Sequence, residues 1–253
     1  MLSYKTSLNM ANMNQVNFGK IITSIGLASL FTLLPLTSGS LRAQGNQINP
    51  AQGFPGNRIS GGTRSGCTAG EKALTAIIPE NNVWVTTAAY PQFYFYLPKA
   101  ADAQEVEFIL RNEEDQQVYE QTFTVSGDAG IVSLSLPESE LLPALEKDKH
   151  YRWYLSVICN TQNRSQDLVV EGWIQRVDMT QNVTSRLDQT DPKTKATLYL
   201  EAGIWHEALN TLAQLRRDQP QDNVVSNQWQ KLLQSIGLEA IAQEPFLDLP
   251  NYD

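Results

Sequence analysis

The chain has 253 residues and a formal net charge of -8 at pH 7, with 42% hydrophobic and 18% charged residues. This length allows one large or two modest domains. An acidic chain repels phosphate backbones, and its basic residues form no run, so we expect no nucleic-acid partner.

The first segment has the pattern of a secretory signal peptide. Lys5 and Lys20 precede the apolar run IITSIGLASLFTLLPL, residues 21–36, which the small-residue stretch TSGSLRA follows. A basic region, an apolar region and a cleavage zone occur in this order in signal peptides, and the run is shorter than the about 20 apolar residues of a transmembrane helix. We therefore predict a signal peptide over residues 1–43, with an uncleaved membrane anchor as the alternative.

Export would place the mature protein in the periplasm or outside the cell. Cleavage after Ala43 removes three basic residues and no acidic one, which leaves 16 minus 27, or -11. No later segment has the length or hydrophobicity of a membrane span, so we predict none after cleavage.

A polar stretch follows the predicted signal. Residues 44–66, QGNQINPAQGFPGNRISGGTRSG, are rich in Gly, Pro and Asn and show no hydrophobic period. That composition is typical of a flexible linker. Its last residues, GGTRSG, lack the Gly-Lys-Ser/Thr ending of a phosphate-binding loop, so the linker interpretation is favoured.

Residues 67–178 have the sequence pattern of a β domain. Short runs of alternating hydrophobic and polar residues are separated by turn sequences such as NEEDQ, SGDAG and NTQNRSQD. Several strands at this spacing without helices between them indicate an antiparallel sandwich or barrel. The predicted strands cover residues 74–78, 83–87, 92–97, 105–111, 117–125, 131–136, 151–159 and 168–177.

One short motif favours the sandwich. Leu145 precedes Tyr151 by six residues, at the entrance to a strand on which Tyr151, Trp153 and Leu155 share a face. This spacing resembles the tyrosine corner of fibronectin type III and immunoglobulin-like domains, where the phenol hydroxyl bonds to backbone a few residues upstream. We therefore predict a fibronectin-like or immunoglobulin-like antiparallel β-sandwich, and we assign the motif no function beyond folding.

Residues 179–247 have the period of helices. Asp191 and Pro192 form a good N-cap and first-turn pair, Gly203 breaks the helix that follows, and a second helix is predicted from about Trp205 to Asp218. This region resembles a tetratricopeptide repeat, whose period is 34 residues. The residues that match its spacing are Ala196, Tyr199, Gly203, Ala208, Leu212 and Pro220.

A second repeat is suggested by the same period. Tyr199, Gly203, Ile204 and Ala208 are followed 34 residues later by Leu233, Gly237, Leu238 and Ala242. About three repeats are needed for independent stability, so we expect this helical tail to dock, either on the sandwich or on a partner. Together the two parts predict an α+β chain, with residues 248–253 as a C-terminal tail.

The two cysteines, Cys67 and Cys159, both lie in the part predicted to be exported. An even number of cysteines in an oxidising compartment favours a disulfide. The alternative is a pair of buried thiols.

The stretch PQFYFYLP, residues 91–98, has no polar face. Side chains alternate along a strand, so Phe93 and Phe95 point to one side while Tyr94 and Tyr96 point to the other. The tyrosine face is then either covered by the helices or the N-terminal segment, or exposed as a binding platform. We name Tyr94, Tyr96 and the nearby Trp84 as candidate ligand-binding residues, although core packing is the favoured role even of Trp84.

The sequence contains no recognisable catalytic or metal-binding constellation. His150 and His206 have no metal-ligand partner at useful spacing, no Gly-x-Ser-x-Gly elbow is present, and the acidic run at residues 113–115 is typical of a solvated turn. A Cys159 and His206 dyad stays open, because such partners meet only in the fold, but a disulfide would remove its nucleophile. We predict neither enzyme activity nor a metal or other cofactor, with a hydrolase as the least favoured alternative.

Several stretches together resemble one family. GGTRSGC, IIPENNVWVTTAAYPQFYFYLP, YRWYLSVIC, VEGWIQRV and LYLEAGIWHEALNTLAQLRR are similar to an exported cyanobacterial family known as domain of unknown function 928, over about residues 61–245. The resemblance implies a periplasmic or secreted protein with a β domain and a helical tail, and it implies no activity. Our leading hypothesis is a non-catalytic adaptor that binds an envelope protein, and the alternative is a carbohydrate-binding module that takes a polysaccharide on Trp84, Tyr94 and Tyr96.

Overall fold

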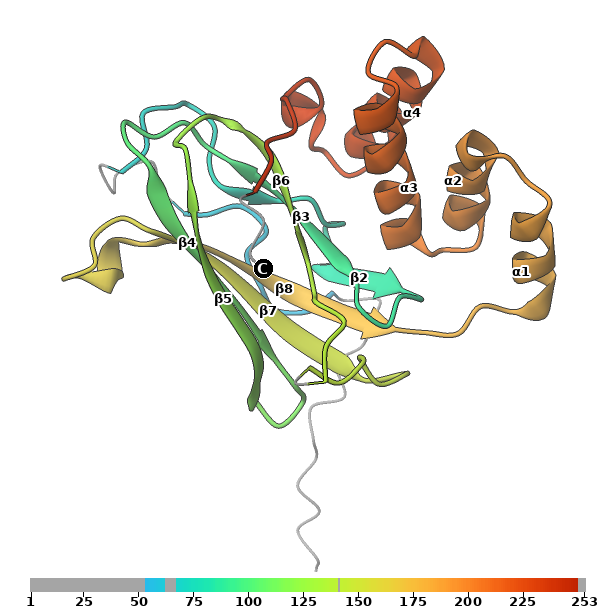
Figure 1. The fold of residues 1–253 in the computed structure, drawn as a ribbon, viewed down its shortest axis with the longest axis horizontal. Helices are drawn as coiled ribbons and strands as arrows, with labels where there is room; N and C mark the ends of the chain where they lie inside the picture. The colour runs from blue at the N-terminus through green and yellow to red at the C-terminus, as the bar shows by residue number, and fades with distance from the viewer. Residues whose placement is uncertain (1–52, 62–66, 141, 250–253) are drawn as a thin grey trace, which may run out of the picture. The chain divides into compact units, whose positions relative to one another are not determined.

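The computed structural model describes residues 53–61, 67–140 and 142–249, all within one compact unit, Asn46–Asp253. The predicted signal peptide, residues 44–52 and 62–66 of the predicted linker, and the end of the tail lie outside the described residues. The described part contains two β-sheets followed by a group of helices (Figure 1), so the chain has the α+β composition that its sequence predicts.

The larger sheet has five strands in the order β2-β8-β7-β4-β5. Its strands are β2 (Val83–Thr86), β4 (Gln104–Arg111), β5 (Gln117–Val125), β7 (His150–Ile158) and β8 (Leu168–Arg176). The smaller sheet has the order β1-β3-β6, with β1 (Thr75–Ala76), β3 (Gln92–Leu97) and β6 (Gly130–Ser135). All eight predicted strands are therefore present, each within two residues of its predicted bounds.

One strand direction differs from the prediction. β2 pairs with β8 in parallel, with Val83 opposite Trp173 and Thr86 opposite Arg176, so the larger sheet is mixed and not purely antiparallel. Parallel neighbours need a long connection between them, and five other strands of the fold separate β2 from β8 in the sequence. The alternation pattern predicts that a strand exists, but it carries no information about its direction.

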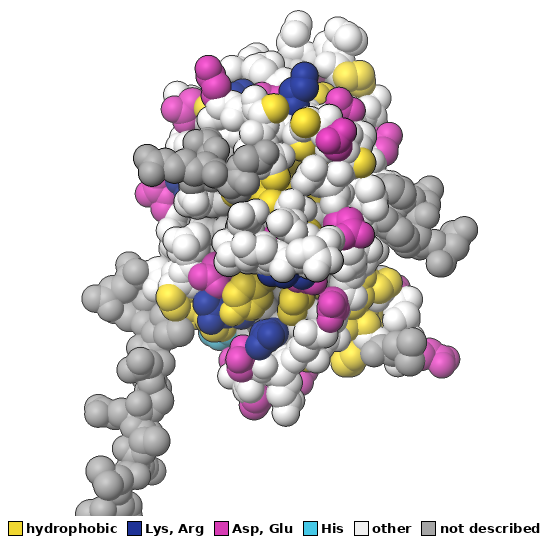
Figure 2. All heavy atoms as spheres, turned by 90° about the vertical axis from the view of Figure 1, so that its left-hand side faces the viewer, with side chains coloured by type: hydrophobic (Ala, Val, Ile, Leu, Met, Phe, Trp, Pro, Cys, Tyr) yellow, Lys and Arg dark blue, Asp and Glu magenta, His cyan; other side chains and the backbone are white. Residues whose placement is uncertain are grey.

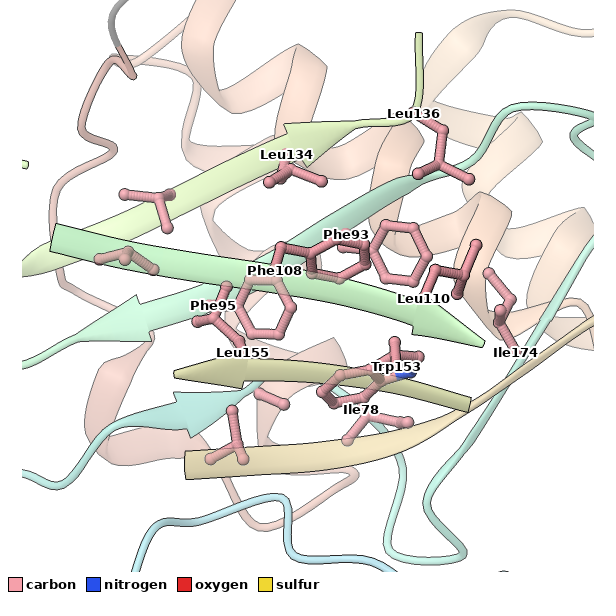
Figure 3. Packing of buried hydrophobic residues seen from close by; sticks show 14 of the residues in the cluster. Ile78, Phe93, Phe95, Phe108, Leu110, Leu134, Leu136, Trp153, Leu155 and Ile174 are labelled. Atoms are coloured by element: carbon pink, nitrogen blue, oxygen red, sulfur yellow. The ribbon is translucent and has the colours of Figure 1, made fainter. Parts of the chain in front are cut away.

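The space between the two sheets is filled by aromatic and aliphatic side chains. Trp84 lies 4.8 Å from Trp153 between ring centroids, and Phe93 lies 4.8 Å from Phe108. Figure 3 shows Phe93, Phe95, Phe108 and Trp153 directed into this space from facing strands, with Leu110, Leu134, Leu136, Leu155, Ile78 and Ile174 around them. The alternating inward residues of both sheets thus form one core, as expected of packed sheets.

Gly172 on β8 has no side chain, and the Trp153 indole occupies the space that one would fill. The two residues are opposite each other across β7 and β8, and a Cβ atom on residue 172 would come within 2.4 Å of the indole ring. No side chain larger than hydrogen fits there without moving the tryptophan.

Two further predictions for the β domain are confirmed. The Tyr151 hydroxyl accepts a hydrogen bond of 3.1 Å from the backbone N–H of Glu146, five residues upstream. Cys67 and Cys159 form a disulfide, which joins the chain before β1 to the end of β7 and leaves no free cysteine among the described residues.

Residues 53–61, which the sequence analysis assigns to a flexible linker, are instead attached to the β domain. The Phe54 ring is 7% exposed and lies 5.2 Å from the Trp173 ring, and Ser60 N–H donates to the Leu74 carbonyl at 2.9 Å. Side-chain hydrogen bonds also hold this segment: the Asn82 amide donates to the Phe54 and Gly56 carbonyls, and the Trp173 indole N–H donates to the Pro55 carbonyl. None of these contacts is visible as a hydrophobic period.

Four α-helices follow the sheets: α1 (Gln181–Asp188), α2 (Pro192–Glu201), α3 (Trp205–Asp218) and α4 (Asn223–Gln234). The Asp191 side chain accepts hydrogen bonds from the N–H groups of Lys193 and Thr194, which caps α2 as predicted. Gly203, with φ of +75°, turns the chain between α2 and α3, a conformation that favours glycine.

Gly237 has φ of +67°, so it repeats the conformation of Gly203 34 residues later. After it, however, the chain forms only a short 3-10 turn, η3 (Glu239–Ile241), in place of a second long helix. Among the described residues, none of the helices has the length and hydrophobicity to cross a membrane.

Candidate functional site

The three aromatic residues singled out from the sequence are all buried. Trp84 is 0% exposed, Tyr94 1% and Tyr96 3%. The Trp84 indole N–H donates to the Ile77 carbonyl at 3.0 Å inside the sheet core, so no face of this ring is open to a ligand.

Tyr94 and Tyr96 lie on the opposite face of β3, under the helical region. They share a second hydrophobic cluster with α3 and α4, whose members include Ile131, Leu209, Leu212 and Trp229. Figure 1 shows α3 beside the smaller sheet, with α2 and then α1 farther from it. The structure therefore places these tyrosines in a docking contact within the chain, where a sugar ring cannot reach them.

The Tyr94 hydroxyl is paired inside this contact. It lies 2.7 Å from Gln92 Oε1 and 2.6 Å from Asn210 Oδ1 on α3. A single hydroxyl proton serves one acceptor, so one of the two amides presents its NH₂ group to the phenol oxygen. Burial raises the pKa of Tyr94 well above its ordinary value, which keeps the phenol neutral.

A polar cluster that the sequence analysis did not identify holds the start of α3 on β2. The buried Glu207 carboxylate accepts hydrogen bonds from the Thr86 hydroxyl at 2.7 Å, the Thr87 N–H at 2.8 Å and the Thr87 hydroxyl at 3.1 Å. Burial alone would raise the pKa of Glu207, but the neighbouring His206 and these hydrogen bonds favour the carboxylate, and its pKa is lowered.

His206 is buried beside this carboxylate. Its Nε2 contacts the Gln92 carbonyl, and its ring meets the Trp84 ring edge-on at 5.7 Å. Burial lowers the pKa of His206, against the opposing effects of Glu207 and the Gln92 carbonyl. His206 is 1% exposed, and Cys159, bonded to Cys67, is not available as its nucleophile.

The end of the chain adds a further attachment. Ile131 N–H donates to the Pro245 carbonyl at 2.7 Å, and Leu247 N–H donates to the Ile131 carbonyl at 2.8 Å, so residues 245–247 extend the smaller sheet beyond β6. On the helical side, the Arg217 guanidinium lies over the Phe246 ring at 4.6 Å and donates to Ser133 Oγ at 2.9 Å. The helical region is thus docked on the β domain of its own chain.

The side of the helices that is not docked contains a groove. It lies between α2, α3 and α4 and has a volume of about 340 Å³, at the lower end of the roughly 300–1,000 Å³ of ligand sites. Its lining is mainly apolar at the base and polar at the rim, and consists of Ala196, Thr197, Leu200, Leu212, Gln228, Lys231, Leu232 and Ser235.

The lining of this groove combines open apolar surface with polar groups. Leu200 is 41% exposed, which leaves apolar surface open to solvent. Lys231 is the one charged residue in the lining, and the Gln228 side-chain oxygen has no hydrogen-bond partner among the described residues. The groove therefore offers an apolar floor and one cation.

A second, smaller pocket of about 120 Å³ is polar and lies near the tyrosine corner. Glu113 there pairs with Lys149 at 3.2 Å and accepts from the His150 N–H at 3.0 Å, and the hydrogen bond to His150 is the main reason that its pKa is lowered. These polar groups are therefore hydrogen-bonded to one another. No group of three or more potential metal ligands occurs in the described part of the chain.

The charged side chains outside these pockets are spread over the surface. Figure 2 shows one face, on which Asp and Glu side chains are scattered among fewer Lys and Arg side chains, with hydrophobic side chains reaching the surface between them. This face offers no continuous basic field to a phosphate backbone.

Comparison with known proteins identifies the family of this chain. The sequence pattern of a family described as Domain of Unknown Function (DUF928) matches residues 59–246. No curated protein matches the chain. Among solved structures, the chain is similar to that of Astrotactin-2, described as a conserved vertebrate-specific and perforin-like membrane protein involved in neuronal development, with 9% identity and a TM-score of 0.28 over 67% of this chain and 33% of that one. The chain thus spans about a third of the length of Astrotactin-2, and a similarity this low carries no argument.

Proposed function

The chain belongs to the family described as Domain of Unknown Function (DUF928), and from this premise we propose that it is an exported, non-catalytic adaptor of the cell envelope that binds a segment of another protein. The groove between α2, α3 and α4 is the observation that carries the proposal. The family description names no activity, so the proposal rests on the residues of this chain.

Export is supported by two features. The Cys67–Cys159 disulfide is of the kind that persists in oxidising compartments, and the N-terminal residues have the signal-peptide pattern described above. We propose a periplasmic or secreted location on these grounds, and the cyanobacterial origin implied by the resemblance stays a prediction.

The arrangement of the helices supports binding by the groove. One side of α3 contacts the β domain through Glu207, Asn210 and Arg217, which fixes the helices in place. A fixed helical pair has little conformational entropy to lose when a ligand binds. We therefore interpret α2, α3 and α4 as a tetratricopeptide-like unit, carried on a fibronectin-like sandwich, whose open side takes the partner.

The charge of the groove indicates the chemistry of the partner. Its lining contains Lys231 and no acidic residue, on a chain whose net charge is -8. A segment with an apolar side chain for the floor near Leu200 and a carboxylate close to Lys231 would satisfy both features.

A peptide-display experiment tests this proposal. The exported protein is used to select from a random peptide library, and the selected peptides are tested against Leu200→Asp in the groove and Val224→Asp, a matched change at a 56% exposed residue of α4 outside the groove. We expect a consensus of an apolar residue next to Asp or Glu, bound by the wild type and by Val224→Asp and lost in Leu200→Asp. Peptides that bind Leu200→Asp equally well would overturn the proposal.

A further inference from the structure

The outer face of the larger sheet presents a regular array of side chains from three neighbouring strands. β4, β7 and β8 are adjacent, and their outward residues stand opposite one another in rows. From one end of the strands, the rows are Arg111, Arg152 and Trp173, then Ile109, Tyr154 and Glu171, then Glu107, Ser156 and Val169. Eight of these nine residues are at least partly exposed, and Ser156 alone is buried.

Two aromatic rings and two guanidinium groups lie together in this array. The Arg152 guanidinium carbon is 4.9 Å from the centre of the Tyr154 ring and 5.7 Å from that of Trp173, and that of Arg111 is 5.9 Å from the Tyr154 ring. Stacking of this kind holds both guanidiniums against the rings. The array therefore holds aromatic rings and guanidinium hydrogen-bond donors in a fixed arrangement.

The charges of this array are balanced. Arg152 Nη2 pairs with Glu171 Oε2 at 2.7 Å, and Arg111 Nη1 pairs with Asp115 Oδ2 at 3.2 Å. Each guanidinium thus has a carboxylate partner and keeps further N–H donors for another ligand. A polyanion gains little from a neutral array on an acidic chain, whereas a neutral ligand rich in hydroxyl groups finds donors and acceptors side by side.

Tyr154 is the least constrained member. Its hydroxyl has no hydrogen-bond partner among the described residues, in contrast to the buried Tyr94 hydroxyl with two. Along β7 its outward neighbours are Arg152 on one side and the small Ser156 on the other, so within this strand a long side chain flanks the ring on one side only. The next row adds Val169, which is 40% exposed.

We propose that this face, defined by Arg152, Tyr154 and Glu171, binds a neutral polysaccharide. The apolar C–H face of a sugar ring stacks on the partly exposed Tyr154 ring, as it would not on a charged side chain, whereas the Trp173 ring already packs against Phe54. Adjacent sugar hydroxyls accept from the Arg152 guanidinium and donate to the Glu171 carboxylate. The inference does not depend on the helical groove, since none of these residues lines it.

Calorimetric titration with defined neutral hexasaccharides tests the proposal. The probes are cellohexaose, maltohexaose, mannohexaose and chitohexaose, added to the protein in its exported form, with a galacturonate hexamer as the anionic comparison. We expect at least one neutral probe to bind with a dissociation constant of about 1 mM or tighter. Tyr154→Ala should weaken that binding at least about tenfold, because it removes the stacking ring.

Two variants separate stacking from other effects. Tyr154→Phe keeps the ring and should bind within about threefold of the wild type, while Leu200→Asp in the helical groove should bind sugar unchanged. Thermal unfolding of each variant confirms that it is folded. No binding of any neutral probe at about 1 mM, tighter binding of the galacturonate hexamer, or equal binding by folded Tyr154→Ala would overturn the proposal.

Discussion

The hydroxyl of Thr86 on β2 donates a hydrogen bond of 2.7 Å to the carboxylate of Glu207 on α3, 121 residues away in the sequence. Thr87 adds its N–H and its hydroxyl to the same carboxylate. A buried carboxylate is stable only when it is hydrogen-bonded, so this contact ties the orientation of α3 to the end of β2.

Replacing Glu207 with Ala should lower the free energy of unfolding by about 2 to 3 kcal/mol, because it removes hydrogen bonds to a charged group and leaves both threonine hydroxyls without an acceptor. Urea unfolding measures the loss. Glu201→Ala on α2 is the control, since its ion pair with Arg186 is exposed and the change should stay within about 0.5 kcal/mol. Equal effects of the two substitutions would contradict the role assigned to Glu207.

The burial of His206 predicts that the protein loses stability in mild acid. Its pKa lies below the ordinary value of 6.5 because of burial, so the unfolded chain takes up a proton at a pH at which the folded chain does not. Stability is therefore complete above pH 6.5 and falls below it, by at most about 1.4 kcal/mol for each pH unit. Glu207, whose pKa is also lowered, adds to the loss only below its ordinary value of 4.5.

Urea unfolding between pH 7.5 and 5 checks this expectation. His206→Gln keeps a donor for the Gln92 carbonyl but does not titrate, and its stability should fall less steeply between about pH 6.5 and 5 than that of the wild type. A wild-type curve that is flat in this range, or a variant curve of equal slope, would show that another group dominates.

The stretch PQFYFYLP shows how far the position of the helices could be predicted from the sequence. A strand with aromatic side chains on both faces has to be covered twice, and the spacing of Asp191, Pro192 and Gly203 predicts helices that need a surface. Both statements follow from period and composition, and helices over Tyr94 and Tyr96, as observed, satisfy both. The competing interpretation, a platform, requires rings that are exposed to solvent, whereas Tyr94 is 1% exposed.

Other features could not be predicted in this way. Glu207 follows His206 in the first turn of a helix, where an acid is ordinarily solvated, and nothing in the sequence links it to Thr86. The array around Tyr154 depends on the register of β4, β7 and β8, which alternation alone does not define. The local period of hydrophobic residues thus predicts the helices and strands and which of their faces are buried. The pairing between distant elements is determined by the whole fold.

Tyr94 and Tyr154 differ in their surroundings, and so should the effect of removing their hydroxyls. Tyr94→Phe leaves Gln92 and Asn210 without their shared partner inside the docking contact and should cost about 1 to 2 kcal/mol of stability. Tyr154→Phe removes a hydroxyl that has no partner among the described residues and should stay within about 0.5 kcal/mol. Thermal or urea unfolding compares the pair, and a larger loss for Tyr154→Phe would mean that the helices do not cover β3 in solution.

Gly130 on β6 tests whether the end of the chain is part of the fold. A Cβ atom at residue 130 would lie 2.7 Å from the Pro245 carbonyl oxygen and 2.6 Å from Leu247 Cγ, so Gly130→Ala has to push residues 245–247 away from the sheet. We expect a loss of about 1 to 3 kcal/mol and faster proteolytic cleavage near the C-terminus, located by mass spectrometry. Gly61→Ala is the matched control, because a Cβ atom at residue 61 meets nothing within 4 Å. If Gly130→Ala were as stable as Gly61→Ala and were cleaved at the same rate, the pairing of Ile131 with residues 245–247 would not contribute to the native state.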